Sequence, residues 1–462
     1  EFKMEKVINL GIPHVGEQIF GSIGTDGLIQ CLQVSPNWTI LAENVLIKRW
    51  KGKMFEACER GETKIVQLLL ELCNWEESGL HTKDEFGTTT FMVACMKGHK
   101  EVVKLLMDFS KRNIDLNARS NDGFTAVTMA CQNGHKDVVQ LLLDHSDPNI
   151  ELNAKDYSEK TAFMWACNYG HADIVEMLLN HLHRNIDLNA KCQDGNTAFM
   201  YACGFGHKDV VQLLLNHQDI TIELNDQDRY GQTALMQASG YGHNEVVQML
   251  LSQLDRIIDV NAKDNYGRTA LTEASGFGHK EVVQLLLNHP DAVFEFNAQD
   301  LNGRSALMQA SEYGHTDIVQ LLLNHPNATI EVNAKDNRGR TALSKASAYG
   351  YEDVVQLLLN HSGRNIDLNA RCQDGNTALM YACRFGHKEV VQLLLDHPAP
   401  EIELNTKDND GMTAFMHACL RGHINVVKLL NICFLKEIGI LKSFLKRKSK
   451  KIVKKSEDTF IK

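Results

Sequence analysis

The sequence predicts an all-α solenoid built from helix pairs with hairpin tips, preceded by a small helical module. One pattern, D-x-x-G-x-[TS]-A-[LF]-M-x-A-[CS]-x-x-G-H-x-x-V-V-Q-L-L-L-N-H, recurs every 36 residues. The apolar positions within this pattern have the spacing of helix faces. The chain of 462 residues also exceeds the size at which a single globular core stops growing, roughly 250–300 residues.

Each unit of the pattern indicates two helices followed by a turn, and the unit around residues 233–267 is representative. Thr233 suits the N-cap of the first helix, and Gly242 suits a left-handed C-cap. Apolar residues at 246, 247, 250 and 251 give the second helix its buried face. Because one helix pair cannot bury its apolar face alone, the units must stack on one another.

The turn between units has a glycine at its tip, which supplies the positive φ that such a turn needs. Ten units follow at a constant spacing of 36 residues, and Glu159 replaces the glycine in one of them. If that turn keeps its shape, Glu159 must adopt a positive φ. The turn glycines are Gly87, Gly123, Gly195, Gly231, Gly267, Gly303, Gly339, Gly375 and Gly411.

The same pattern sets the expected domain boundaries. The ten units of 36 residues occupy residues 84–430, and a shorter copy at residues 51–83 is expected to cap them. Residues 9–50 do not follow the repeat and form a separate helical module after a leader at residues 1–8. Residues 431–462 form a basic tail that we expect to be partly disordered.

Charge and cysteine usage restrict the compartment and the partners. The net charge of −10 is the sum of about +7 in residues 442–462 and about −17 elsewhere, so the repeats are unsuited to coating nucleic acid. Seven of the twelve cysteines share one repeat position, where four successive units have serine. That position requires a small packed side chain, which fits a reducing compartment. With no signal region and no long uncharged run, we expect a cytoplasmic or nuclear protein and no membrane contact.

The repeating residues resemble the ankyrin repeat over roughly residues 50–430. Two features depart from the family pattern: T-P-L-H is T-A-[LF]-M here, and the period is 36 rather than about 33 residues. The extra residues fall between the second helix and the turn, where they lengthen a loop. The resemblance implies a protein-binding solenoid whose client lies on the concave face and the tips.

Residues 9–50 are similar in spacing to an F-box, a module that binds the Skp-type adaptor of a cullin ubiquitin ligase. The match has three departures: Ile12 for leucine, Ser35 for cysteine and Gly27 for aspartate. The alternative is that this segment only caps the array. By resemblance, the module's core and adaptor-binding face would be formed by Pro13, Ile19, Phe20, Leu28 and Trp38.

Cysteine and histidine recur together as C-x-x-x-H, which could suggest a metal site because residues four apart on a helix can share a ligand. Cys95 with His99 and Cys131 with His135 are two examples. A glycine precedes each histidine and ends the helix, and units with serine keep the histidine. We therefore expect no metal and no cofactor.

Two surfaces are candidates for binding a client. Seven successive units have an aromatic residue near the end of the first helix, which favours either packing between repeats or a row facing the ligand. These aromatics are Tyr169, Phe205, Tyr241, Phe277, Tyr313, Tyr349 and Phe385. The turns are the second surface, since they are free of core duty. Their candidate client-binding residues are Arg268, Arg304, Arg340, Tyr230, Tyr266 and Arg338.

These patterns favour a non-enzymatic substrate receptor of a cullin-type ubiquitin ligase, with the module docking the adaptor and the solenoid holding the client. No phosphate-binding loop, nucleophile elbow or paired catalytic carboxylates occur in the sequence. Two alternatives remain open: a scaffold outside the ligase system, and a nuclear regulator whose basic run at residues 446–451 acts in import.

Overall fold

A computed structural model gives the fold. It describes residues 20–34, 36–73, 79–109, 114–144, 150–181, 186–217, 222–253, 258–289, 294–326, 329–361, 366–397 and 402–437. Within these ranges the chain forms 24 helices and no strands, which confirms the predicted all-α fold class. The chain divides into two compact units, residues 1–223 and residues 224–462.

The first unit contains two helices of the N-terminal module and five helix pairs. The described part of the module contains α3 (Thr25–Cys31) and α4 (Pro36–Trp50). The pairs that follow are α5 (Met54–Arg60) with α6 (Thr63–Leu72), α8 (Thr90–Lys97) with α9 (Lys100–Asp108), α10 (Ala126–Gln132) with α11 (Lys136–Asp144), α12 (Ala162–Asn168) with α13 (Ala172–Asn180), and α14 (Ala198–Gly204) with α15 (Lys208–Asn216).

The second unit contains six helix pairs of the same kind. They are α16 (Ala234–Gly240) with α17 (Asn244–Leu251), α18 (Ala270–Phe277) with α19 (Lys280–Leu287), α20 (Ala306–Tyr313) with α21 (Thr316–Asn324), α22 (Ala342–Tyr349) with α23 (Glu352–Asn360), α24 (Ala378–Phe385) with α25 (Lys388–Asp396), and α26 (Ala414–Leu420) with α27 (Ile424–Glu437).

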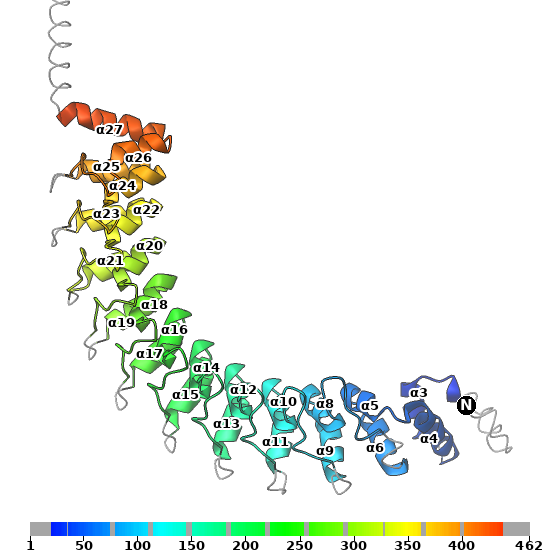
Figure 1. Ribbon diagram of the computed structural model, residues 1–462. Coiled ribbons are helices and arrows are strands. Elements are labelled where there is room, and N and C mark those ends of the chain that lie inside the picture. The colour runs from blue at the N-terminus through cyan, green and yellow to red at the C-terminus, as the bar shows by residue number, and fades with distance from the viewer. Residues whose placement is uncertain are drawn as a thin grey trace, which may run out of the picture. The chain divides into compact units, whose positions relative to one another are not determined.

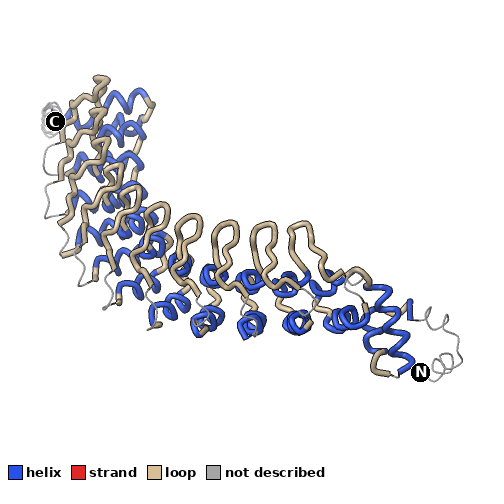
Figure 2. Tube along the Cα trace, turned by 60° about the horizontal axis from the view of Figure 1, so that its bottom comes forward, coloured by secondary structure: helices blue, strands red, loops and turns tan. Residues whose placement is uncertain are grey.

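Within each unit the helices form two layers (Figure 1). The first helices of successive pairs pack side by side, as α18 does on α20 and α22 on α24, and the second helices form the other layer. The loops that join one pair to the next project beyond the helices as long fingers (Figure 2). Valines and leucines of the second helices are buried against the first helices, so each pair completes its core only by stacking.

The ends of the first helices match the sequence prediction. Thr233 has an extended backbone, and its hydroxyl accepts a hydrogen bond from the amide of Met236 at 3.3 Å. Gly242 follows the helix with a φ of 77°. Such a threonine cap contributes about 1 kcal/mol to helix stability. The repeated T-A and G-H pairs therefore define where each first helix begins and ends.

Within each unit, histidines of the G-H pairs join neighbouring repeats. His279 donates from Nε2 to the carbonyl oxygen of Gly240 at 2.9 Å, because a carbonyl can only accept. A Cβ at Gly242 would lie closer than 3.0 Å to the His279 ring, so the glycine makes room for it. The same bond, 2.8–3.1 Å long, is made by His99, His135, His171, His207, His279, His315, His387 and His423.

Two further bonds join successive turns. The amide of Asn265 donates to the carbonyl oxygen of Tyr230 at 2.8 Å, which connects one turn to the next. The side chain of Asn261 accepts from the amide of Glu295 at 2.9 Å, one repeat further along. These bonds recur along each unit and satisfy backbone groups that a loop would otherwise leave to water. Hydrogen bonds therefore join each finger to the next one within a unit.

Glu159 has a φ of 60°, which no other described non-glycine residue matches in sign. The predicted turn geometry is therefore confirmed. A left-handed backbone costs an L-residue roughly 1–2 kcal/mol. Its side chain approaches only Lys155, at 3.5 Å, and both side chains are exposed, so this ion pair offsets little.

We predict that Glu159→Gly raises the free energy of unfolding by about 1 kcal/mol, since glycine adopts this backbone without strain. Urea unfolding followed by circular dichroism measures the change. Gly123→Ala is the matched control in the neighbouring turn, where φ is 83° and a Cβ would lie 2.9 Å from the amide nitrogen of Tyr157. That variant must lose stability. An unchanged or lower stability of Glu159→Gly would contradict the strain argument.

Candidate functional site

In seven of the repeats a residue of the first helix contacts the loop that precedes it. Trp165 donates from Nε1 to Oδ2 of Asp156 at 2.8 Å, and His417 Nε2 lies 2.7 Å from Oδ2 of Asp408. Both pairs are nine residues apart. The other Oδ atom of each aspartate accepts backbone amides of the turn, as Asp156 does from Ser158. The aspartate thereby fixes the turn against its own helix.

Two repeats replace this aspartate with cysteine, and both place tyrosine on the helix. Cys192 Sγ lies 3.2 Å from the hydroxyl of Tyr201, and Cys372 Sγ lies 3.4 Å from the hydroxyl of Tyr381. Burial and the cysteine contact raise the pKa of both tyrosines. The hydroxyl therefore stays protonated and can donate to the turn.

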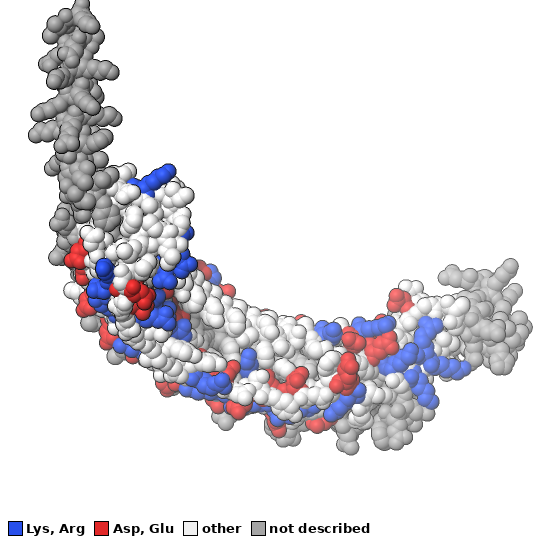
Figure 3. Space-filling model, turned by 45° about the horizontal axis from the view of Figure 1, so that its top comes forward, with Lys and Arg blue, Asp and Glu red and all other residues white. Residues whose placement is uncertain are grey.

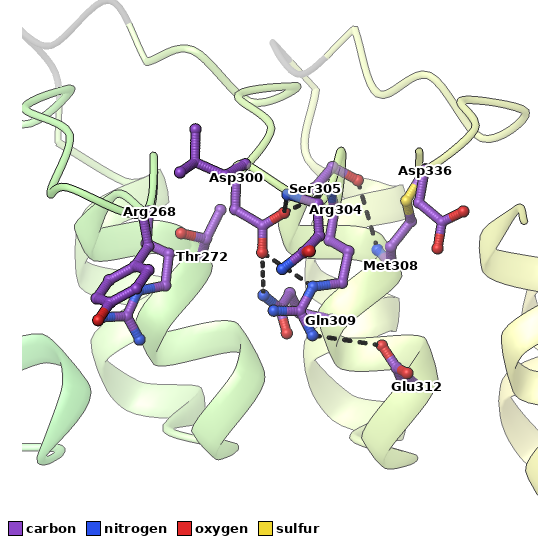
Figure 4. A network of polar contacts seen from close by, with 12 residues as sticks. Arg268, Thr272, Asp300, Arg304, Ser305, Met308, Gln309, Glu312 and Asp336 are labelled. Carbon is purple, nitrogen blue, oxygen red and sulfur yellow. Dashed lines mark hydrogen bonds and ion pairs between the residues drawn. The ribbon is translucent and has the colours of Figure 1, made fainter. Parts of the chain in front are cut away.

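The three arginines that follow turn glycines are bound to aspartates of this kind, and Figure 4 shows the pair of Arg304 and Asp300. Arg268, Arg304 and Arg340 lie 2.7–2.9 Å from Oδ2 of Asp264, Asp300 and Asp336, respectively. The arginine side chains are 24–26% exposed and the aspartates 1% exposed. The sequence suggested that these arginines are free of structural duty, whereas each one neutralises a buried carboxylate of its own turn.

Lys345 extends this network into the core. Its side chain is 1% exposed, and Nζ lies 3.0 Å from Oδ2 of Asp336 and 3.0 Å from Oε2 of Glu312. Burial raises the pKa of Asp336, but the Arg340 amide and the Lys345 ammonium outweigh it and hold that pKa below its ordinary value. The Asp336 carboxylate is therefore ionised at neutral pH. Lys345 joins two successive repeats through charge.

We predict that Lys345→Ala lowers the free energy of unfolding by about 3 kcal/mol, because it leaves two carboxylates without their shared cation. Lys345→Gln is the matched control and should cost about 1 kcal/mol or less. Gln309 holds the equivalent position and donates to Asp300 at 3.4 Å. Urea unfolding at pH 7 distinguishes the two variants. Both variants remove the charge, so equal losses would show that a hydrogen-bond donor at position 345 contributes nothing beyond the charge of Lys345.

The ion pair between Asp336 and Lys345 should also make the free energy of unfolding depend on pH. The pKa of Asp336 is lower in the folded chain than in the unfolded one, so its stabilisation is complete above about pH 4–5 and lost as the pH falls through the lowered value. Lys345→Ala should therefore show a smaller loss of stability between pH 5 and 2 than the parent chain, by the same urea measurement.

The aromatic row lies at the C-terminal ends of the first helices and is exposed. In the second unit the exposed fractions are 69%, 62%, 51%, 55% and 52% for Tyr241, Phe277, Tyr313, Tyr349 and Phe385. Four of these rings lie 6.3–6.5 Å from the histidine two residues later, and Tyr349 stacks on Tyr351 at 6.1 Å. Their contacts hold the rings in place without burying them.

The remaining turn residues lie at the tips of the fingers. Tyr230 and Tyr266 are 43% and 54% exposed, and Arg338 is also exposed. The Arg268 guanidinium lies over the ring of Tyr266, 4.9 Å from its centroid. Charged side chains of both signs are intermixed over the face shown in Figure 3, with broad uncharged stretches between them.

The cysteine and the histidine of the C-x-x-x-H pattern have separate structural roles and do not form a common site. Cys131 is fully buried, and burial raises the pKa of its thiol to about 12, while His135 donates to Met96 of the preceding repeat. No group of three or more metal-binding side chains occurs among the described residues, and no described helix is long and apolar enough to span a membrane.

A family model described as ankyrin repeats matches residues 54–156, 149–226, 221–295, 292–372 and 362–434. The chain belongs to the ankyrin-repeat family. A comparison with curated proteins gives no match. The fingers, paired helices and G-H junctions are thus the ankyrin architecture in a 36-residue form, and such repeats are protein-interaction modules.

The family match begins after the N-terminal module, so that module is described by its own contacts. Phe20, Leu28 and Trp38 are buried, and the rings of Phe20 and Trp38 meet edge to face at 5.6 Å. Pro13 and Ile19, the other two predicted adaptor residues, lie outside the described residues. Helix α4 packs on α6 of the first ankyrin pair. The three described residues thus form a core that is continuous with the array.

Sequence reasoning missed Lys345 and Tyr381 as members of the first-helix face. A signal was present, because in seven units the residue nine positions after the turn aspartate or cysteine can hydrogen-bond or pair with it. Tryptophan, glutamine, lysine and histidine accompany aspartate, while tyrosine accompanies cysteine. Comparison of the ankyrin units with one another would have paired these positions.

Proposed function

We propose that the ankyrin array binds a protein client through the exposed aromatic row and the adjoining turns of the second unit. The observation that carries this proposal is the row itself: five large rings, each more than half exposed, recur at the spacing of the repeats. Exposure of this much aromatic surface to water is unfavourable, and protein interfaces are enriched in tyrosine and phenylalanine. The turn residues Tyr230, Tyr266, Arg338, Arg268, Arg304 and Arg340 would border the client.

We further propose that residues 9–50 connect this client to a Skp-type adaptor of a cullin ubiquitin ligase. The F-box-like spacing supports this role, together with two exposed apolar side chains on the described part of the module. Val34 and Ile40 are 56% and 57% exposed, beside the core of Phe20, Leu28 and Trp38. The alternative function, a cap for the array, is favoured by the packing of α4 on α6.

The client-binding proposal predicts that Phe277→Ala, Tyr313→Ala and Tyr349→Ala together weaken binding by at least about tenfold, because aromatic anchors dominate interface energies. A protein that co-purifies with the chain is identified, produced pure and titrated by calorimetry. The control replaces the exposed second-helix residues Gln284 and Gln320 by alanine. Loss of binding only in the control variant would place the client on the opposite layer.

The adaptor proposal predicts that the full chain co-elutes with a purified Skp-type adaptor in size-exclusion chromatography. Val34→Asp with Ile40→Asp should abolish co-elution, since charge is costly in an apolar contact. Ile424→Asp is the control, because this residue is 66% exposed at the other end of the chain. If the parent chain does not co-elute, the module is a cap. Deleting residues 1–50 should then lower the melting temperature by uncovering α6.

A further inference from the structure

A hollow opens between α22 and α24 within the aromatic row. Its volume is about 330 Å³. Tyr349 and Phe385 form its exposed walls, and Ala348, Arg340 and Tyr381 also line it. The hollow lies wholly within the second unit, between two successive repeats. Two large aromatic rings beside the cations Arg340 and Lys345 suit a ligand that is partly apolar and partly anionic.

The three arginines of the turns differ in how completely they are paired. Nη1 of Arg268 lies 2.8 Å from Glu273, and Nη1 of Arg304 lies 3.8 Å from Glu312. Each glutamate belongs to the first helix of the same repeat. In the third repeat the positions of Glu273 and Glu312 are held by Lys345 and Ala348.

Arg340 therefore has no second carboxylate. Its Nε and Nη2 both face Oδ2 of Asp336, at 3.0 and 2.9 Å. Among the residues that the structure describes, Nη1 of Arg340 makes no ion pair within 4.0 Å. This nitrogen belongs to a residue that lines the hollow. A carboxylate brought in by a ligand would take the place that glutamate occupies in the two preceding repeats.

The other polar groups at the hollow are already committed. The ammonium of Lys345 is shared by Asp336 and Glu312. The hydroxyl of Ser344 donates to the carbonyl oxygen of Thr341 at 2.9 Å, as part of a helix cap. The hydroxyl of Tyr381 is paired with Cys372. Arg340 is thus the group that gives the hollow its charge preference.

The walls are fixed before any ligand arrives. Tyr349 stacks on Tyr351, and Phe385 lies 6.4 Å from the ring of His387. His387 in turn donates to the carbonyl oxygen of Ala348 at 3.0 Å, which connects the Phe385 wall to another lining residue. A site whose walls are already ordered loses less entropy when it binds.

We propose that this hollow binds a client peptide with an aspartate or glutamate next to a bulky apolar residue. The carboxylate pairs with Arg340, and the apolar side chain lies between Tyr349 and Phe385. The peptide continues along the row, since Tyr313 stands exposed one repeat away. This inference rests on the proposed client-binding function and names the segment that the array recognises.

The test is a selection of random 12-residue peptides displayed on phage, using the full chain as bait. Enriched peptides are synthesised with a fluorophore and titrated by anisotropy. We expect an acidic residue within two positions of Phe, Tyr, Trp or Leu. Ala348→Glu should weaken binding about tenfold or more, because it supplies Arg340 with an internal carboxylate. Ala348→Gln, of the same size without the charge, should retain most of the affinity.

A second comparison isolates the ion pair. Changing the peptide's acidic residue to its amide should weaken binding about tenfold or more to the parent chain and have little effect on Ala348→Glu or Arg340→Ala. Melting curves of all variants report their folding. Peptides that bind Ala348→Glu as well as the parent would overturn the site, while leaving the client proposal to calorimetry of the aromatic variants. A selection that enriches no acidic peptide would also overturn the site.

Discussion

The contact between the glycine and the histidine of successive G-H pairs is the constraint on which each unit depends. The glycine must lack a Cβ because the histidine ring of the next repeat occupies that space, as His279 does beside Gly242. The ring then donates to a carbonyl near the end of the preceding first helix. The glycine–histidine contact therefore fixes the position and orientation in which one helix pair stacks on the next. The regular spacing of the two helix layers follows from it.

A fixed stacking geometry has a direct consequence for the surface. In seven successive units the residue before this glycine is the exposed aromatic of the row, and rings such as Phe277 and Tyr313 lie beside the histidine that joins the repeats. Positions of the rings are thus set by the junctions rather than by packing in the core. The five rings of the second unit form a regular row because the glycine–histidine contact recurs in successive repeats. A substitution within the row changes the side chain that is exposed but not the spacing between positions.

The fold followed from the sequence because its signals repeat, while the site was harder to predict. Thr233, Gly242 and the unusual Glu159 could be placed by local rules for caps and turns. The ion pairs of Arg268 and Arg304 could not be predicted in this way. A residue beside a turn glycine is expected to be exposed if only its neighbours within the same helix are considered. Their aspartates lie four residues earlier in a loop, and Lys345 meets Glu312 across 33 residues. These pairings have a fixed spacing from the turn aspartate but not the period of a helix, so helical periodicity alone does not reveal them.

In a regular array, specificity has to come from the units that depart from the pattern. Most polar side chains on the first-helix face already form hydrogen bonds or ion pairs with one another. They therefore leave few polar groups free to bind a ligand. Two of the differences between the repeat of Arg340 and its neighbours bear on this site: lysine replaces a neutral or acidic group at 345, and alanine stands at 348 where the preceding repeat has glutamate. The lysine takes over the buried carboxylates, and the alanine leaves a hollow beside the arginine. Together they convert a self-contained ion-pair network into one with a vacant place for a carboxylate, at a site whose surroundings the junctions hold rigid.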